Sequence, residues 1–467
     1  MTFRTTALLT ASLLSANVAQ AALTAEEVAQ LGVTGTPLTP LGGERAGNAE
    51  GTIPPWTGGL SAPPPGFVPG GLHIDPFPNE QPLFTITANN YQQYADKLTP
   101  GQTGMFERYP DSWKMHIYPT HRTARYPDWV YEATRQTAQT IKLCGERCVE
   151  PESIADGGGI PFPIPKTGYE ANMNANFTYY GKVVRFPGHS VVVTPGGDFA
   201  VSEIDLEFQH IYWMNAAEKP DVPFFNRNGG VWWCFGGMFT APSRQAGQVL
   251  NGCGFMRDLR VDSYIYIPGQ RRVRKAPEVG FYDQPAQGTD GLMTSHSRNG
   301  LYFSGSEEWF DYELVGKRER FMPYNNYRIM DPTLRAEDVV LAGHADPQYI
   351  RYELHRAWEV EATLREGYRN LQPRQVVYID EDSWVSPMAE RYNQQDQLWR
   401  YQERFVTYFY EPQAVFSAAT VAYDMISGRW SSAIDSFPGF SGGHIDFDQP
   451  ARFDLMTPQG IRMMGRR

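Results

Sequence analysis

One pentapeptide in the sequence has the composition of a nucleophilic site. The stretch Gly439 to Gly443 (Gly-Phe-Ser-Gly-Gly) matches the nucleophile-elbow pattern, in which a serine lies on a sharp turn between a strand and a helix. That arrangement also needs an acidic residue and then a histidine later in the chain. Pro438 precedes the motif, and His444 and Asp446 follow it too closely to complete such a triad. We therefore expect a glycine-rich loop, and predict no catalytic residue.

The histidines and carboxylates form no recognisable metal-binding motif. The nine histidines contain no His-Glu-x-x-His and no His-x-His arrangement, the spacings that bring two imidazoles to one ion. The run Asp380 to Asp382 (Asp-Glu-Asp) could bind calcium, but the glycine and the terminal glutamate of a calcium loop are missing. We expect a solvated hairpin tip at these residues, with no metal and no cofactor.

The first residues have the pattern of an export signal. Arg4 is followed by an apolar run from Ala7 to Ala16, and then by Ala19-Gln20-Ala21 as a small-x-small cleavage site. We predict a signal peptide at residues 1–21, with no lipid anchor because no cysteine lies near the cut. No other window approaches the 18 apolar residues of a membrane span, so the mature protein is predicted to be soluble outside the cytoplasm.

Four cysteines remain after this signal. An even number outside the cytoplasm indicates disulfides, for which three connectivities exist. We predict the two local bridges, Cys144–Cys148 and Cys234–Cys253. Zinc would need two pairs at short spacing, and Cys234 and Cys253 are too far apart to form one.

The net charge of the chain limits the kinds of molecule that it could bind. The formal net charge of −11 argues against nucleic acid, because phosphate binding needs a basic surface. The densest basic cluster is the set Arg271, Arg272, Arg274 and Lys275, directly after Pro268-Gly269. A hairpin with four cations could dock on an anionic partner or on lipid head groups, and the alternative is a solvated turn paired with carboxylates.

The stretch from Tyr352 to Arg365 supplies the main structural signal. Apolar residues alternate with polar ones such as Glu353, His355 and Glu359, which predicts a strand with one face in solvent and one buried. Further strands are predicted at residues 190–194, 198–201, 261–268, 271–275, 308–317, 375–379, 398–410 and 415–424. Helices are predicted earlier, at residues 25–31, 90–98, from 100 onward, 127–143 and 168–177. Helices before a long antiparallel run indicate an α+β fold, with the sheet as a curved half-barrel or a sandwich.

Several long blocks resemble one known family. The stretch Gly42 to Gly59 (GGERAGNAEGTIPPWTGG) closely resembles the opening of a proteobacterial secreted family known as domain of unknown function 1329. Other blocks resemble the family in the same order, and they cover nearly all of the mature chain: Lys114 to Arg122, Pro268 to Pro277, Leu314 to Arg328, Tyr352 to Trp384 and Leu398 to Glu403.

This resemblance implies a fold and a compartment. Members look like relatives of the periplasmic lipoprotein-carrier fold, an incomplete antiparallel barrel around a hydrophobic cavity that helices plug or cover. The expected organisation is then a short helix and Pro/Gly-rich arm at 22–88 and one half-barrel domain at 89–467. Within that domain we expect a helical part (89–180), a β-rich part (181–435) and a C-terminal tail (436–467).

The resemblance also implies a function, a periplasmic carrier for a hydrophobic or lipid-like molecule. Such a carrier would work with an outer-membrane protein and an exporter of the resistance-nodulation-division class. From the alternation we predict that its cavity is lined by Tyr264, Tyr266, Trp358, Val360 and Tyr378, although a plain core position is the favoured alternative for each of them. An envelope adaptor without a small ligand remains the alternative.

Overall fold

A single curved sheet dominates the structure, a computed structural model that describes residues 22–145, 148–257, 260–276, 285, 288–294, 307–435 and 445–465. Within these residues sixteen strands belong to the sheet. They are β1 (Phe84–Ile86), β2 (Met115–Ile117), β3 (Val183–Val193), β4 (Phe199–Gln209), β5 (Val231–Ala241), β6 (Val249–Phe255), β7 (Val261–Ile267), β8 (Arg272–Lys275), β9 (Phe310–Pro323), β10 (Tyr352–Leu364), β11 (Arg374–Asp380), β12 (Met388–Tyr392), β13 (Leu398–Phe409), β14 (Ala414–Asp424), β15 (Trp430–Asp435) and β16 (Asp446–Phe447).

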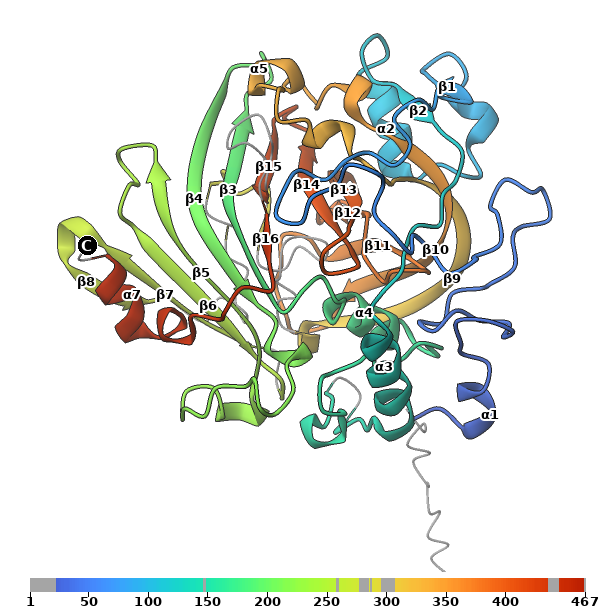
Figure 1. Cartoon of the computed structure of the whole chain (residues 1–467). Coiled ribbons are helices and arrows are strands. Elements are labelled where there is room, and N and C mark those ends of the chain that lie inside the picture. The colour runs from blue at the N-terminus through green and yellow to red at the C-terminus, as the bar shows by residue number, and fades with distance from the viewer. Residues whose placement is uncertain are drawn as a thin grey trace, which may run out of the picture.

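Two halves of the chain build this sheet. Strands β3 to β8 follow one another as antiparallel neighbours, and so do β9 to β15. Pairing of β15 with β3 joins the halves, with Ser431 opposite Val192. The sheet therefore runs from β8 at the left of Figure 1 through β3 and β15 to β10 and β9 at the right.

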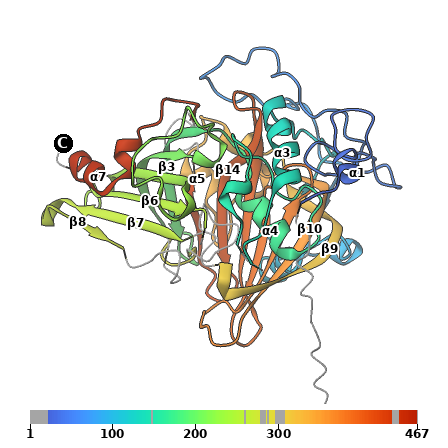
Figure 2. The ribbon, with the colours of Figure 1, turned by 90° about the horizontal axis from the view of Figure 1, so that it is seen from below.

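The helices are few and short. They are α1 (Ala25–Val28), α2 (Pro100–Arg108), α3 (Asp128–Thr140), α4 (Gly168–Asn176), α5 (Ala336–Val339) and α7 (Pro458–Met464). Capping fixes where α2 begins, because the Thr99 hydroxyl accepts a hydrogen bond from the Gln102 backbone N–H, and the Gln102 side-chain oxygen accepts one from the Thr99 backbone N–H. Helices α3 and α4 lie at the lower end of the sheet in Figure 1 and stand in front of the strands in Figure 2.

Different segments cover the two faces of the sheet. Helix α4 packs against β9 and β10, and its Tyr169 ring lies 6.0 Å from that of Tyr312. Just beyond α4, the centre of the Phe177 ring lies 5.0 Å from that of Trp232 on β5, so this segment contacts both halves of the sheet. We call the face that carries α4 the inner face. The outer face carries α2 over β12 and β13, and α7 over β6 and β7.

The expected α+β fold with a large open curved sheet is confirmed, and so is the strand at 352–365. The prediction that one face of this strand lies in solvent is wrong. Glu353, His355 and Glu359 are at most 4% exposed, because the N-terminal arm and the segment after β2 cover them. Alternation therefore marks two chemically different buried environments here.

Three other local predictions need correction. The helix expected at 90–98 is only a short 3-10 turn at Tyr91–Tyr94. Strands β5 and β6 were not expected, because Gly236, Gly237 and Gly252 favour a loop by composition. The run 380–382 is not a solvated tip, since Asp380, Glu381 and Asp382 are at most 5% exposed.

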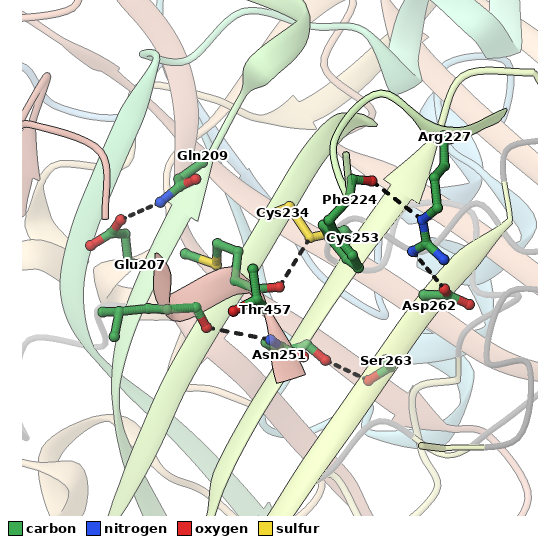
Figure 3. The surroundings of a disulfide bond; sticks show 12 residues. Glu207, Gln209, Phe224, Arg227, Cys234, Asn251, Cys253, Asp262, Ser263 and Thr457 are labelled. Carbon is green, nitrogen blue, oxygen red and sulfur yellow. Dashed lines mark hydrogen bonds and ion pairs between the residues drawn. A yellow bond between two sulfur atoms is a disulfide. The ribbon is translucent and has the colours of Figure 1, made fainter. Parts of the chain in front are cut away.

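Both expected disulfides are present. Cys144 is bonded to Cys148, and Cys234 is bonded to Cys253 directly across the β5–β6 pair. Figure 3 shows the second bond under the C-terminal segment, where the Asn251 amide donates to the Leu455 carbonyl at 3.3 Å. This disulfide therefore lies where the chain end is fastened to the outer face.

Candidate ligand-binding face

The inner face over β3 to β6 is apolar. The register places Phe186 opposite Leu206, and Phe208 opposite Phe235. These side chains are at most 6% exposed. A Cβ at position 252 would lie 2.5 Å from Cε1 of Phe235, so the glycine there lets the ring lie flat on the neighbouring strand. Strands β3 to β6 thus present an aromatic surface to the inside of the curve.

The same face is polar over β11 to β13. The register aligns Gln375, Arg391 and Arg400 in one row across the three strands. Gln402 and Arg404 follow on the same side of β13, because side chains alternate along a strand. All are buried except the half-buried Arg404. Two glutamines and three arginines, which we call the inner polar cluster, therefore face the interior.

Several polar atoms of this face have no hydrogen-bond partner within the described part of the chain. They are both amide atoms of Gln375, both amide atoms of Gln402 and the hydroxyl of Ser431 on β15. These three residues are fully buried. A buried polar group without a partner costs about 1–3 kcal/mol, so five such atoms are a large cost for one protein.

A short segment passes over this region. Arg400 donates a hydrogen bond to the Leu292 carbonyl at 3.0 Å. A Cβ at Gly288 would lie 3.0 Å from Ser190, on the inner face of β3. Residues 288–294 therefore contact the inner face on both sides of β14 and β15.

A cavity of about 550 Å³ lies beside the start of β5. Most of its lining is apolar, and Trp232, Tyr212 and Met256 contribute large side chains. Asp156 and Lys219 are the charged residues of its wall. The ring of Trp232 also contacts Phe177 next to α4, so this cavity adjoins the apolar part of the structure.

The five residues predicted to line a cavity do not lie together. Trp358 and Val360 are on the inner face, where Val360 is opposite Val377. Tyr378 is opposite Glu359 and so lies on the outer face. Tyr264 and Tyr266 are also on the outer face, where Tyr266 packs with Ile461 of α7. A role in lining a cavity on the inner face thus remains a proposal only for Trp358 and Val360.

The predicted basic cluster lies at an edge of the sheet. Arg271, Arg272, Arg274 and Lys275 are all exposed on the β7–β8 hairpin, and β8 is the last strand in the sheet order. Lys275 pairs with Asp262 at 2.7 Å, and this hydrogen bond raises the pKa of the lysine. One of the four cations is thus engaged in the hairpin.

A buried ionic network occupies the outer face of β10 and β11. His355 contacts Glu353 through Nε2 at 3.2 Å, and its Nδ1 lies 3.7 Å from Asp380 Oδ1. Burial, together with the neighbouring Asp382 carboxylate, raises the pKa of Asp380 to about 6. Burial lowers the pKa of His355, but the hydrogen bond that its ring donates to Glu353 and the charge of Asp380 raise the pKa overall.

His355, Asp380 and Asp382 are close enough together to share a metal ion, since one ligand atom of each lies within 4.8 Å of the others. The surroundings do not favour an ion. Both carboxylate oxygens of Asp382 accept hydrogen bonds from the Arg122 guanidinium at 2.7 Å. The cation at this position is therefore an arginine, and we assign no metal.

Arg122 connects this network to the N-terminal arm. Besides Asp382 it donates to the Glu44 carbonyl at 2.6 Å. Lys317 bridges the carboxylates of Glu44 and Glu381 at 2.9 Å each. The acidic run 380–382 thus binds the arm to the sheet.

A second buried carboxylate lies under α2. Glu403 accepts hydrogen bonds from the hydroxyls of Tyr352 and Tyr401, both at 2.9 Å. Burial raises the pKa of Glu403 to about 7, although both hydroxyls act in the opposite direction. Since α2 and its neighbours cover this side, Glu403 belongs to the outer-face core.

Two predicted features lie outside the described residues. They are the signal peptide at 1–21 and the glycine-rich motif around Ser441. Among the helices that the structure describes, none is long and apolar enough to cross a membrane.

The inner polar cluster was missed by sequence reasoning. A signal was present, because Arg400, Gln402 and Arg404 alternate with Tyr401 and Glu403 along β13. It was not decisive, since both alternating sets contain polar residues. Only the register with Gln375 and Arg391 shows that the polar residues converge.

Comparisons with known proteins place the chain in a family. Residues 85–462 match the model of a family described as a protein of unknown function, DUF1329. An uncharacterised protein of Pseudomonas aeruginosa is 39% identical over 469 residues, which cover 99% of this chain and 98% of the relative.

Solved structures with a similar fold are more distant. A DUF1329 family protein from Desulfovibrio piger has a TM-score of 0.40 and 12% identity, covering 62% of this chain and 95% of that one. A putative outer membrane lipoprotein-sorting protein domain from Vibrio parahaemolyticus has a TM-score of 0.40 and 8% identity, covering 61% and 94%. A LolA superfamily protein from Nitrosomonas europaea has a TM-score of 0.35 and 8% identity, covering 63% and 98%. Because the family model matches most of the sequence and a relative aligns over nearly its full length, this chain belongs to the DUF1329 family.

Proposed function

We propose that this protein is a periplasmic carrier that holds a hydrophobic, lipid-like molecule against the inner face of its curved sheet. The observation that carries the proposal is the aromatic surface of β3 to β6, with residues such as Phe208 and Phe235, on the inside of the curve. Apolar concave surfaces are the usual sites for hydrophobic ligands.

The apolar cavity beside β5 supports the same reading. Its volume of about 550 Å³ lies in the range of small-molecule sites, and Trp232 links its wall to the aromatic surface. The predicted export signal, the two disulfides and the family's resemblance to lipoprotein carriers support a periplasmic location.

Blocking the inner face tests this function. Ala200 is exposed on the inner side of β4, in one row with Val192 and Ser431, whereas Asp205 is exposed on the outer side of the same strand. We expect Ala200→Trp to weaken uptake of a fluorescent fatty acid by purified, delipidated protein at least tenfold, because the indole fills the space over the sheet. Asp205→Trp is the matched control and should bind as the wild type does. Equal binding by all three proteins would contradict an inner-face site.

A second role rests on the exposed edge of the sheet. Strand β8 ends the strand order, and the β7–β8 hairpin displays Arg271, Arg272 and Arg274 to solvent. We propose that a carrier working with an outer-membrane protein or an exporter of the resistance-nodulation-division class would dock through this edge. Replacing the three arginines by glutamine should then abolish partner capture without changing ligand uptake. Partner capture that survives these replacements would exclude the hairpin as the docking element.

A further inference from the structure

We propose that the partner which docks at the β8 edge contributes an extended acidic segment, and that this segment pairs with β8 as a further strand of the sheet. This inference rests on the docking role proposed above for that edge, and it specifies the conformation and the chemistry of the partner. It is carried by two features of the β7–β8 hairpin, an open row of backbone hydrogen-bonding groups and a pair of guanidiniums without carboxylate partners.

The backbone of β8 is open on one side. Strand β8 is the last in the sheet order, and within the described residues it pairs only with β7. The Ala276 amide, one residue past the strand, donates to the Ser263 carbonyl of β7 at 2.8 Å. Because the amides of an antiparallel strand point alternately toward and away from its neighbour, the N–H and C=O groups of Val273 and Lys275 point away from β7.

An open strand edge is a template for another strand. Figures 1 and 2 both show β8 at the outer margin of the sheet, next to β7. Extended segments bind to such edges through main-chain hydrogen bonds, and their alternate side chains give the selectivity. A segment that paired with Val273 and Lys275 would lie about 4.8 Å from β8 and would extend the sheet by one strand.

Two arginines lie along this open edge. Arg272 and Arg274 are opposite two isoleucines that alternate with the outer-face tyrosines of β7, so both guanidiniums project on the inner side. Both side chains are exposed, and within the described part of the chain neither has an ion-pair partner. Two residues of an extended strand span about 7 Å, which is also the spacing of alternate side chains on a paired strand.

The neighbouring strands do not balance these charges. Among the strands β5 to β8 only β7 contains an acidic residue, Asp262. Asp262 is opposite Cys253 on the outer side, where it already binds Lys275 at 2.7 Å and Arg227 at 3.1 Å. Helix α7, which packs over β7 and β8, adds Arg462 and no acidic residue. This edge is therefore positive in a chain whose net charge is −11, which favours an acidic partner.

The same charges select against the wrong strand. A second copy of this chain would present the same arginines, and like charges opposite one another on paired strands are destabilising. A segment with an acidic residue at every second position would instead place its carboxylates opposite Arg272 and Arg274. The edge thus disfavours its own copies and accepts an acidic strand.

Synthetic peptides test this pairing on the full-length mature protein. The probe is Thr-Glu-Val-Glu-Val-Glu-Thr, in which all carboxylates share one side of a strand. One control has the same composition with its glutamates consecutive, and the other has glutamine at each glutamate position. We expect calorimetry to show that the probe binds about tenfold more tightly than either control. The first control has the same net charge as the probe, so strand pairing alone separates the two.

Charge reversal tests where the probe binds. The double variant Arg272→Glu, Arg274→Glu should lose the probe and bind its counterpart with lysine at each glutamate position. The double variant Arg257→Glu, Arg335→Glu makes the same change of charge at two exposed arginines outside the hairpin, and it should bind the probe as the wild type does.

A backbone substitution tests the hydrogen bonds of the edge. Val273→Pro removes one open donor and leaves the ladder with β7 in place, because the Val273 amide points away from that strand. It should weaken the probe several-fold, whereas Val273→Ala keeps the amide and should not. If the proline disturbs the hairpin, the comparison of alternating with consecutive glutamates still decides the question.

The failures are distinguishable. Equal binding of the alternating and the consecutive glutamate peptides would overturn the added strand. Binding of phosphatidylglycerol vesicles in place of any peptide would assign the arginines to lipid head groups and would also overturn it. Uptake of a fluorescent fatty acid is measured on the same preparation. Uptake without peptide binding would overturn the added strand and leave the carrier function standing, and peptide binding without uptake would do the reverse.

Discussion

Removing the Arg122 side chain tests whether the acidic run 380–382 fastens the N-terminal arm to the sheet. Arg122 is 7% exposed and donates to both oxygens of Asp382 at 2.7 Å and to the Glu44 carbonyl at 2.6 Å. Although burial lowers the pKa of Arg122, the Asp382 carboxylate raises it overall, so the guanidinium stays charged.

The expected magnitude follows from burial. Arg122→Ala leaves Asp382 and its neighbour Glu381, which are at most 5% exposed, without their shared cation. Breaking a buried ion pair by removing one partner costs about 3–5 kcal/mol. A solvated hairpin tip would lose less than about 1 kcal/mol. The two interpretations therefore differ by a readily measured amount.

Urea denaturation followed by tryptophan fluorescence measures this free energy. Arg335→Ala is the matched control, because the Arg335 side chain is 76% exposed and pairs with Glu337 at 3.5 Å. It should change the unfolding free energy by no more than about 0.5 kcal/mol. Arg122→Ala should also expose the arm to proteolysis between residues 22 and 82. A loss below about 1 kcal/mol with an intact arm would refute the reasoning.

Three further outcomes follow from single contacts. Because burial raises the pKa of Glu403 to about 7, the wild-type free energy of unfolding should fall by roughly 3 kcal/mol as the pH rises from 4.5 to about 7. Glu403→Gln should lack this decline. If urea titrations give the wild type the same free energy of unfolding at pH 5 and at pH 8, the prediction is wrong. Replacing Cys234 and Cys253 by alanine should cost about 3 kcal/mol, since their bond closes a loop with a sequence separation of 19, and an unchanged melting midpoint would speak against this value. Trp358→Ala should reduce ligand retention and leave the fold intact; loss of the folded state would instead show that Trp358 is core.

Short sequence patterns were sufficient to predict the helices and strands whose patterns are strong. The capping box at Thr99 and the alternation from residue 352 each predicted the correct element, because hydrogen-bond and burial constraints act within a few residues. Strands β5 and β6 were missed, since their glycines favour a loop by composition, although Gly252 of β6 lets the Phe235 ring of β5 lie flat.

The environment of each face could not be predicted from one strand. Alternation shows that Glu353 and His355 share a side, but water and a buried ionic network produce the same pattern. The inner-face assignment failed for a related reason. Trp358 and Tyr378 both belong to alternating strands, and only the pairing of Tyr378 with Glu359 places them on opposite faces. Register is a property of two strands, so a single sequence segment does not contain it.

Native mass spectrometry of protein purified gently from the periplasm, followed by solvent extraction, tests the central claim most directly. The carrier account predicts a stoichiometric bound mass that the solvent releases as a hydrophobic, lipid-like molecule. A clean ligand-free mass, from protein that also fails to take up fatty acids or lysophospholipids, would contradict it.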